Sequence, residues 1–242
     1  MMKNQPKTCL DMQESYKCNL CNDLTFILND NEAIPCRCKD LREAERILEN
    51  SGLSEAFKRK RFENFDYTKN KEILNAYIMA KSYANDFNID SKCNNSIIFM
   101  GQPGFGKTHL VLAIANYLMK NCVGVVYMNY REQITAIKQS IMDSENYNAI
   151  MSRYKNARVL LIDDLFKGSV TPSDINIMFE IINYRYLNKK PMIISTEKYI
   201  NDLLSIDEAL GSRIIEMCGT HNLELRGKHL NYRLKVGGDN LC

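Results

Sequence analysis

The sequence predicts an α/β protein in which a parallel β-sheet carries helices on its faces. The first observation is a short apolar run, Ile97–Met100, which leads through a glycine-rich turn into an amphipathic segment with Leu110, Ile114 and Leu118 on one helical face. The second is that apolar segments of strand length then alternate with segments of helical period as far as Leu225. This alternation is typical of parallel sheets, because a helix carries the chain back between strands that run in one direction.

The turn after the first strand, residues 101–108, reads G-x-x-x-x-G-K-T, the pattern of a phosphate-binding loop between a strand and a helix. Glycines let consecutive backbone N–H groups curl around an anion, and the following helix directs its positive end at the phosphates. Lys107 supplies a charge for the β- and γ-phosphates, and the Thr108 hydroxyl is placed to ligate Mg²⁺. The complete pattern outweighs the alternative of a chance glycine-rich turn, so we expect the chain to bind a nucleoside triphosphate. The residues expected around it are Gly101, Gln102, Pro103, Gly104, Phe105, Gly106, Lys107, Thr108 and His109.

A second motif, V-L-L-I-D-D at Val159–Asp164, is an apolar strand that ends in two carboxylates. In nucleotide-hydrolysing proteins such a strand is expected beside the phosphate loop, and its first acid holds Mg²⁺. We assign that role to Asp163, and to Asp164 the orientation or deprotonation of the attacking water. By itself an apolar strand ending in two Asp residues fits a surface turn equally well. Paired with the phosphate loop, it predicts an ATP site.

Composition limits the remaining possibilities. The 242 residues are 45% hydrophobic and 25% charged, and the net charge of +3 is too small to indicate nucleic-acid binding by itself. No apolar run approaches the ~20 residues that a membrane helix needs. The N-terminal residues M-M-K-N-Q-P-K-T lack the apolar core of a signal peptide, so we expect a cytoplasmic protein without a membrane partner.

Two close cysteine pairs, Cys18/Cys21 and Cys36/Cys38, flank a short hairpin-like stretch with its turn at residues 29–31. Thiolates from two short loops supply the four soft ligands that Zn²⁺ prefers. The alternatives are a redox pair or unrelated free thiols, but a redox C-x-x-C would precede a helix in a βαβ unit, and none is visible here. We expect a small zinc-binding lobe that depends on its metal to fold.

A helical region is expected to link this lobe to the nucleotide-binding part. Asp40 is a candidate N-cap of a helix ended by Gly52, and a second segment follows with the basic run Lys58–Arg61. Four consecutive basic residues point to all sides of a helix and do not line up on one face. This favours a solvated linker helix over a surface that binds phosphates. Phe62 and Phe65 either pack against the nucleotide base or close a core, and we favour the core.

The other elements are expected in alternation. Further strands are expected at Val123–Asn129, Arg158–Asp163, Pro191–Ser195 and Asn222–Leu225. Helices are expected over Lys69–Phe87, Glu132–Ile141, Tyr147–Tyr154, a segment capped by Thr171 with Pro172 at its first position, Asn201–Leu204 and Asp207–Met217.

Five stretches together make the sequence resemble a known family. They are residues 101–110, 159–165, P-M-I-I-S-T-E (191–197), A-L-G-S-R-I-I-E-M (209–217) and N-Y-R-L (231–234). The first two are common to many P-loop proteins, whereas the third and fourth, in that order, are similar to AAA+ ATPases of the DnaC/DnaI helicase-loader type, with the transposition helper IstB as a relative. The resemblance covers most of residues 62–242.

The resemblance implies a five-stranded parallel AAA+ sheet and roles for further residues. Arg213 matches an arginine finger that reaches the ATP of a neighbouring subunit, the alternative being a surface arginine. Arg233 resembles a second sensor. A polar sensor of the γ-phosphate is expected after the fourth strand; many relatives have Asn where this chain has Glu197, and we choose Thr196. Too little chain follows Arg213 for a full helical lid, which fits the loader branch.

The function that the resemblance implies is that of a bacterial or phage helicase loader. Residues 1–60 would bind a replicative DnaB-type hexameric helicase, and an ATPase domain over 61–242 would self-associate through its ATP site and touch single-stranded DNA. ATP, Mg²⁺ and Zn²⁺ would be the cofactors, and hydrolysis would be slow and stimulated by assembly or DNA.

Three alternatives stay open. An IstB-like transposition helper would remodel duplex DNA for a transposase. A non-hydrolysing, nucleotide-gated adaptor is suggested by the short Asp164 where Glu is usual and by Glu197 where Asn is usual. A small-molecule kinase is the weakest alternative, because no acceptor-site pattern is present.

Overall fold

The computed structural model describes residues 16–29, 32–50, 57–68, 70–89 and 95–227. The chain forms two compact units, Met1–Lys39 and Asp40–Cys242. The functional division at residue 60 stays a prediction, and Arg233 lies outside the described residues. Among the described residues, no helix has the length and apolar character needed to cross a bilayer.

The larger unit is built on a five-stranded sheet in the order β4-β5-β6-β3-β7, and every neighbouring pair is parallel. Its strands are β3 (Ile97–Gly101), β4 (Val125–Asn129), β5 (Val159–Leu165), β6 (Met192–Thr196) and β7 (Asn222–Leu225). The fold class and each predicted strand are confirmed, with ends that move by no more than a few residues. Together with the helices on both faces, this is the AAA+ arrangement that the resemblance implied.

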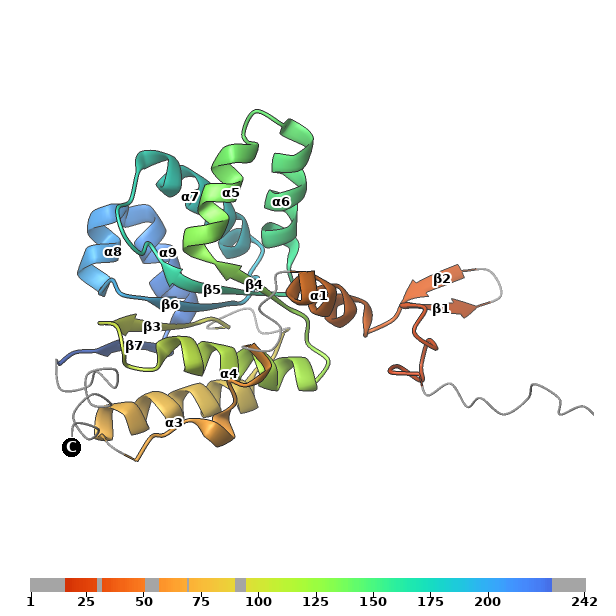
Figure 1. Ribbon diagram of the computed structural model, residues 1–242, viewed down its shortest axis with the longest axis horizontal. Coiled ribbons are helices and arrows are strands. Elements are labelled where there is room, and N and C mark those ends of the chain that lie inside the picture. Colours follow the sequence, from red (N-terminus) through yellow and green to blue (C-terminus); the bar gives the residue numbers. More distant parts are fainter. Residues whose placement is uncertain (1–15, 30–31, 51–56, 69, 90–94, 228–242) are drawn as a thin grey trace, which may run out of the picture. The chain divides into compact units, whose positions relative to one another are not determined.

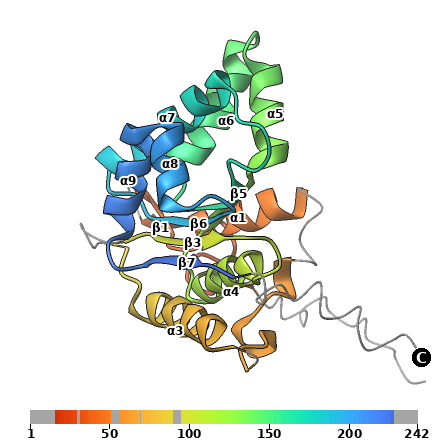
Figure 2. The ribbon, with the colours of Figure 1, turned by 90° about the vertical axis from the view of Figure 1, so that its left-hand side faces the viewer.

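The helices lie in two layers (Figures 1 and 2). One face of the sheet is covered by α3 (Lys71–Asp86) and α4 (Lys107–Lys120). The other face is covered by α5 (Tyr130–Ser140), α6 (Ser144–Asn156), α7 (Pro172–Leu187), α8 (Ile200–Ile206) and α9 (Glu208–Cys218). The unit also contains α1 (Lys39–Asn50) and the 3₁₀ turn η1 (Phe62–Asn64).

The strands are apolar on both faces because each face meets a helix layer. In β3, Ile97 and Phe99 belong to the core shared with α3 and α4, whereas Ile98 and Met100 belong to the core shared with α5–α9. Successive side chains of a strand point to opposite faces, so an unbroken apolar run fills both cores. The same alternation determines which side chains at the ends of the strands face the phosphate loop.

The predicted cap of α7 is confirmed. The Thr171 side chain accepts a hydrogen bond from the Asp174 N–H, the Asp174 carboxylate accepts one from the Thr171 N–H, and Pro172 occupies the first helical position. The predicted cap of the first helix is wrong. Helix α1 begins at Lys39, so Asp40 lies in its first turn, where a negative charge still favours the helix dipole.

The strand of the paired acids lies beside the phosphate loop, as expected, because Asp163 of β5 accepts a hydrogen bond from Thr108 of the loop, although β5 and β3 are not neighbours in the sheet. Strand β6 lies between β5 and β3 and pairs with both of them. All these strands are parallel, so their carboxyl ends share one edge of the sheet. Side chains from β5, from β6 and from the loop after β3 therefore meet there, with β6 supplying the middle of the site.

The smaller unit contains a hairpin in which β1 (Phe26–Asn29) pairs antiparallel with β2 (Glu32–Pro35). Ile27 lies opposite Ile34 across the pair. The buried residues described in this unit are cysteines, so the hairpin has little apolar core of its own.

Candidate nucleotide and metal sites

The phosphate loop has a backbone that favours glycine. Gly101 has φ +134° and Gly106 has φ +78°, values that residues with a Cβ rarely adopt. A Cβ on Gly101 would lie 2.2 Å from the Leu225 carbonyl oxygen of β7, and a Cβ on Gly106 would lie 2.7 Å from Cε2 of Phe65. The glycines are therefore needed both for the curl of the loop and for the close approach of its neighbours.

Lys107 lies at the start of α4 with its ammonium group turned into the loop. Its Nζ donates to the Gly101 carbonyl at 2.6 Å and to the Gln102 carbonyl at 2.8 Å. Burial lowers the pKa of Lys107 to about 8, because a charged ammonium is costly away from water. A bound anion would favour the charged form, so this lysine is well suited to a phosphate.

Asp163 is the centre of a hydrogen-bond cluster at the end of β5. Its Oδ1 accepts from the Thr108 hydroxyl at 3.0 Å and from the Ser195 hydroxyl, and its Oδ2 accepts from the Tyr127 hydroxyl at 3.3 Å. Burial raises the pKa of Asp163 despite these bonds. Thr108 and Asp163 were predicted to ligate Mg²⁺, and this pair of oxygen donors fits a hard divalent cation that keeps several of its waters.

Asp164 has a different environment from Asp163. Its Oδ2 accepts from Lys167 Nζ at 2.7 Å, and its N–H donates to the Ser195 hydroxyl at 2.9 Å. Lys167 also approaches Glu197 Oε1 at 3.3 Å, and the bond to Asp164 is the main reason why the pKa of Lys167 is raised. The candidate base is therefore ion-paired within its own chain.

The phosphate loop and Asp164 line a cavity of about 520 Å³, a size suited to a small ligand such as a nucleotide, and Asp163 is not among its lining residues. Of the predicted residues, its lining includes Pro103, Gly104, Gly106, Lys107, Thr108, His109 and Asp164. The residues that complete the lining are Lys60, Asn64, Phe65, Asp66, Lys167 and Glu197. The cavity thus combines a phosphate loop, acids and an aromatic wall.

The aromatic wall comes from the segment before α3. The Phe65 ring meets the His109 ring edge-on with their centroids 5.1 Å apart. His109 Nε2 lies 2.9 Å from the Arg61 carbonyl and 3.0 Å from Asn64 Oδ1, and burial lowers the pKa of this imidazole. Phe62 and Phe65 both belong to the core, as favoured from the sequence, but Phe65 also faces the cavity.

The structure does not bring Thr196 to the cavity. Ile193 faces the α3/α4 core and Ile194 the opposite core, so alternation places Ser195 on the side of the phosphate loop and Thr196 on the other side. The Thr196 hydroxyl donates to the Leu165 carbonyl at 2.7 Å. The alternation of side chains along β6 would have indicated that Ser195, and not Thr196, faces the phosphate loop. The sequence interpretation missed this residue.

Arg213 lies on α9 and does not line the cavity of its own chain. Its guanidinium faces the rings of Phe179 and Tyr186 on α7, with its carbon 5.1 Å and 5.6 Å from their centroids. Its Nη1 donates to the Ala209 carbonyl at 2.7 Å. A role for Arg213 at a nucleotide would therefore require a neighbouring subunit.

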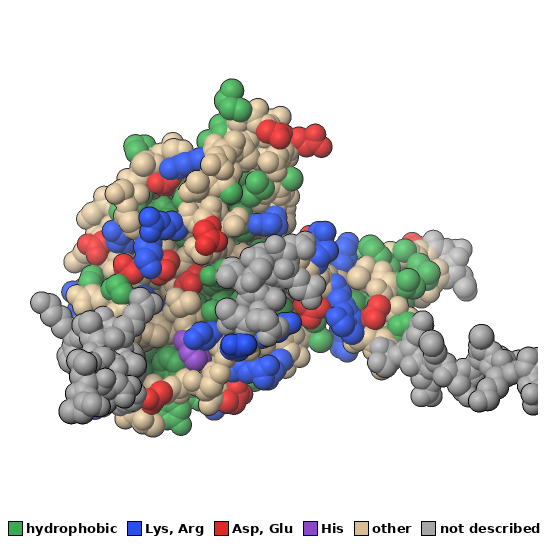
Figure 3. Space-filling view, viewed as in Figure 1, with side chains coloured by type: hydrophobic (Ala, Val, Ile, Leu, Met, Phe, Trp, Pro, Cys, Tyr) green, Lys and Arg blue, Asp and Glu red, His purple; other side chains and the backbone are tan. Residues whose placement is uncertain are grey.

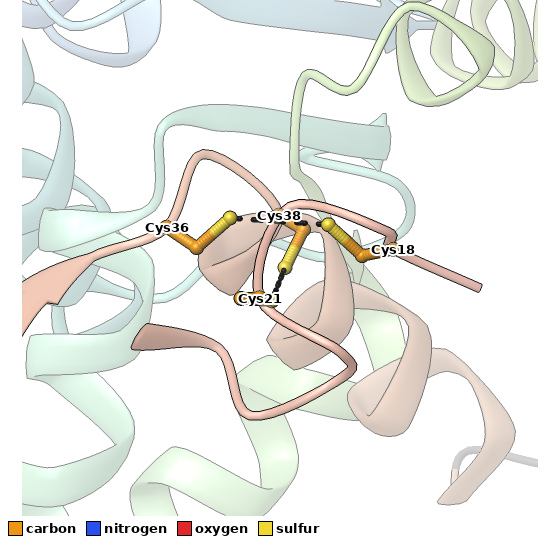
Figure 4. Close-up of side chains that lie close together, drawn as sticks. All are labelled: Cys18, Cys21, Cys36 and Cys38. Carbon is orange, nitrogen blue, oxygen red and sulfur yellow. Dashed lines mark hydrogen bonds between the residues drawn. The ribbon is translucent and has the colours of Figure 1, made fainter. Parts of the chain in front are cut away.

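The four predicted zinc ligands converge in the smaller unit (Figure 4). All the sulfur atoms of Cys18, Cys21, Cys36 and Cys38 lie within 4.8 Å of one another. The Cys18–Cys36 pair is separated by 3.9 Å and the Cys21–Cys38 pair by 3.4 Å. Thiolates ~2.3 Å from a tetrahedral zinc ion lie roughly 3.8 Å apart, so the cluster fits zinc.

Comparisons with known proteins agree with this fold. Residues 57–219 match the family described as the bacterial DnaA ATPase domain. The phage-like element PBSX protein XkdC of Bacillus subtilis (strain 168) is 38% identical over 234 residues, which cover 91% of this chain and 87% of that protein. The replicative helicase loader DnaC of Buchnera aphidicola subsp. Baizongia pistaciae is 30% identical over 215 residues, covering 86% and 83% of the two chains.

Solved structures show the same fold. The crystal structure of the DnaC helicase loader has a TM-score of 0.56 and 24% identity over 71% of this chain and 99% of that one. A replication initiator DnaA bound to AMPPCP and single-stranded DNA has a TM-score of 0.59 and 23% identity over 76% of this chain. This chain spans only 56% of that DnaA chain.

The fold, the phosphate loop and the matched family together define a AAA+ ATPase related to the ATPase domain of bacterial DnaA. Within that class, the identity and coverage shared with DnaC show that the chain belongs to the DnaC-type helicase loaders of DNA replication.

Proposed function

We propose that this chain is an ATP-dependent loader that binds a replicative DnaB-type helicase and delivers it to single-stranded DNA. The single observation that supports ATP dependence best is the cavity lined by Lys107 and by Thr108, whose hydroxyl donates to Asp163. The loader role is supported by DnaC relatives at 30% and 27% identity over most of the chain.

In this proposal the loop and Lys107 bind the phosphates, and Thr108 and Asp163 hold Mg²⁺. Mg²⁺ would draw charge from the phosphate oxygens, and Asp164 would orient or deprotonate the attacking water. Arg213 of a neighbouring subunit would complete the site. Hydrolysis is slow in the isolated chain because Asp164 is paired with Lys167 and because the chain's own arginine lies away from its cavity.

The cysteine unit is the proposed helicase-binding surface. It carries apolar side chains on its outside, with Leu20, Leu24 and Leu28 exposed by 53%, 62% and 69%. Apolar side chains gathered on so small a unit are typical of an interaction site. Zinc, held by the cysteines, would fix the hairpin that presents them.

Single-stranded DNA is the second proposed partner. One structurally similar DnaA is bound to AMPPCP and single-stranded DNA. In this chain the basic run Lys58–Arg61 is exposed, and Lys60 lines the rim of the nucleotide cavity. Figure 3 shows Lys and Arg side chains, interspersed with acidic ones, on the drawn surface, and basic groups of this kind attract phosphates.

The proposal is tested by purified components. The full chain is mixed with the host's DnaB-type helicase with and without Mg-ATP, and complex formation and ATP turnover are measured with and without single-stranded DNA. We expect a complex, and turnover that rises with DNA.

The double variant Leu24→Ser/Leu28→Ser should weaken the complex at least about tenfold while leaving ATP binding intact. Ile141→Ser, an exposed apolar change in the larger unit, is the matched control. Failure of the full chain to bind the helicase would contradict the loader function.

A nucleotide-gated adaptor is the second candidate, and the Asp164–Lys167 pair favours it. An adaptor would bind ATP and the helicase without measurable turnover, even with DNA present. Turnover in the experiment above separates the two.

A further inference from the structure

We propose that Lys167 is the residue with which this chain recognises the terminal phosphate of a nucleoside triphosphate, and that Asp164 and Glu197 hold it in place for that contact. The inference rests on the proposed ATP binding and goes beyond it, because it assigns a role to a lysine outside both nucleotide motifs.

The contacts of Lys167 place its charge in the cavity. Its Nζ lies 2.7 Å from Asp164 Oδ2 and 3.3 Å from Glu197 Oε1. All three side chains line the cavity that also contains Lys107 and Thr108. The lysine side chain is 35% exposed, so it faces the cavity and is able to exchange partners there.

The backbone around Lys167 directs it inward at a conformational cost. Asp164 has φ +59° and Phe166 has φ +58°, left-handed values that are unfavourable for non-glycine residues, and Gly168 follows with φ +89°. Phe166 is fully buried against the Tyr130 ring, with their centroids 5.6 Å apart, and this packing anchors the turn. Unfavourable backbone of this kind is concentrated at functional sites, where the surrounding structure maintains it.

The charges of the site require a cation at this position. Asp163, Asp164 and Glu197 gather at the carboxyl ends of β5 and β6, and Lys107 at the phosphate loop and Lys60 at the rim are the other ammonium groups that line the cavity. A triphosphate brought against three carboxylates would be repelled, although Mg²⁺ would offset part of this. Lys167 offsets the charge of Glu197, whose carboxylate would otherwise repel the terminal phosphate.

A surface ion pair without function is the competing explanation, since exposed pairs contribute little to stability. That explanation accounts neither for the left-handed turn nor for a lysine shared between two acids inside the cavity. The terminal phosphate carries more negative charge than either carboxylate and, like them, forms charge-assisted hydrogen bonds with an ammonium group, so it competes for Lys167. We therefore expect the terminal phosphate to take Lys167 over from one or both of its carboxylate partners.

The test measures equilibrium binding of AMPPCP and of ADP, each with Mg²⁺, to the full chain. Lys167→Met should weaken AMPPCP binding at least about tenfold and ADP binding less than about threefold, because only the triphosphate has the terminal group. Lys167→Arg, which keeps the charge, should retain the preference for AMPPCP. Lys198→Met is the matched control, since Lys198 lines the neighbouring hollow but not the nucleotide cavity.

The double variant Lys167→Met/Glu197→Gln separates direct contact from charge balance. Removing the charge of Glu197 should restore only part of the AMPPCP binding that Lys167→Met loses; recovery to the wild-type level would mean that Lys167 only neutralises Glu197, and would overturn the inference. Equal losses for AMPPCP and ADP, or no loss, would overturn it as well. If the wild-type chain binds neither nucleotide, the proposed function fails together with this inference. If the wild type binds both nucleotides and Lys167→Met binds them equally well, only this inference fails.

Discussion

At the scale of single residues, the site is defined by two buried ionisable groups, Lys107 and Asp163. Burial disfavours their charged forms, and bound ligands of opposite charge would favour them again. Burial lowers the pKa of Lys107 and raises the pKa of Asp163, so both groups are shifted toward their neutral forms. An anion on the lysine and a divalent cation on the aspartate would each favour the ionised form. Ligand binding and proton binding are therefore coupled at this site.

This coupling predicts how ATP affinity depends on pH. Burial is the largest influence on Lys107, with Glu197, Asp164 and Asp163 raising its pKa and Lys167 lowering it, to a net value of about 8. A phosphate binds the protonated lysine, so binding raises this pKa and takes up a proton. ATP affinity should hold below pH 8 and fall as the pH rises above it.

Calorimetric titration in buffers of different ionisation enthalpy checks this prediction. Proton uptake on binding should be small at pH 7 and larger at pH 8.5, where free Lys107 is partly neutral. Affinity that does not change between these pH values, without proton uptake, would show that Lys107 is fully charged in the empty site.

At the scale of elements, β7 depends on the phosphate loop for its position. Gly101 is the last residue of β3 and pairs with Leu225. The Leu225 carbonyl oxygen occupies the space that a Cβ would need if residue 101 were not glycine. The loop that binds phosphate is therefore also the surface on which the last strand of the sheet docks.

Gly101→Ala should destabilise the larger unit by about 3 kcal/mol, because the new methyl group collides with backbone at an unfavourable φ. Gly168→Ala is the matched variant: it also has positive φ, but its Cβ meets open space, so a loss of about 1 kcal/mol is expected from the backbone alone. Urea unfolding measures both. Equal losses would mean that β7 moves aside without cost.

The cysteine hairpin is an element whose stability we expect to depend on the proposed zinc ion. Its buried residues are the ligands themselves, and several of its apolar side chains point outward. Removing zinc should therefore unfold this unit and leave the larger one folded.

Cys36→Ser should reduce bound zinc from about one ion per chain to none, since structural zinc needs all four ligands. The hairpin should become sensitive to protease, while the thermal midpoint of the larger unit stays unchanged. Cys122→Ser, at an exposed cysteine outside the cluster, serves as the control and should keep its zinc. Unchanged zinc content in Cys36→Ser would exclude the proposed ligand set.

At the scale of the whole molecule, the ATP site is incomplete within one chain if Arg213 acts as predicted. The arginine lies on α9 against the rings of α7, outside its own cavity. Turnover should then depend on contacts between chains, and protein concentration should raise the activity per chain.

Mixing two inactive variants tests this dependence. Arg213→Ala should bind ATP normally but lose at least about 100-fold in turnover, as expected for an arginine finger. Lys107→Ala should not bind ATP but should still supply its arginine. A mixture of the two should regain activity, since one partner brings the nucleotide and the other the arginine. A mixture as inactive as its components would mean that Arg213 does not act between chains.

Several features could be predicted from the sequence because they depend on short stretches of chain. The phosphate loop, the five parallel strands and the cap at Thr171 follow from local pattern, and the converging cysteines follow from their spacing. Strands, helix caps and tight turns are each determined by residues a few positions apart, so the order of residues in the sequence is enough to predict them.

What only the tertiary structure decided is which side chains meet. The sequence does not reveal that β6 lies between β5 and β3, and this order places Ser195 against Asp163. Nor does it reveal that the turn after β5 brings Lys167 to Glu197, the residue that follows β6. These contacts join residues distant in the chain, and they are set by the packing of both helix layers on one sheet, a property that no single segment contains.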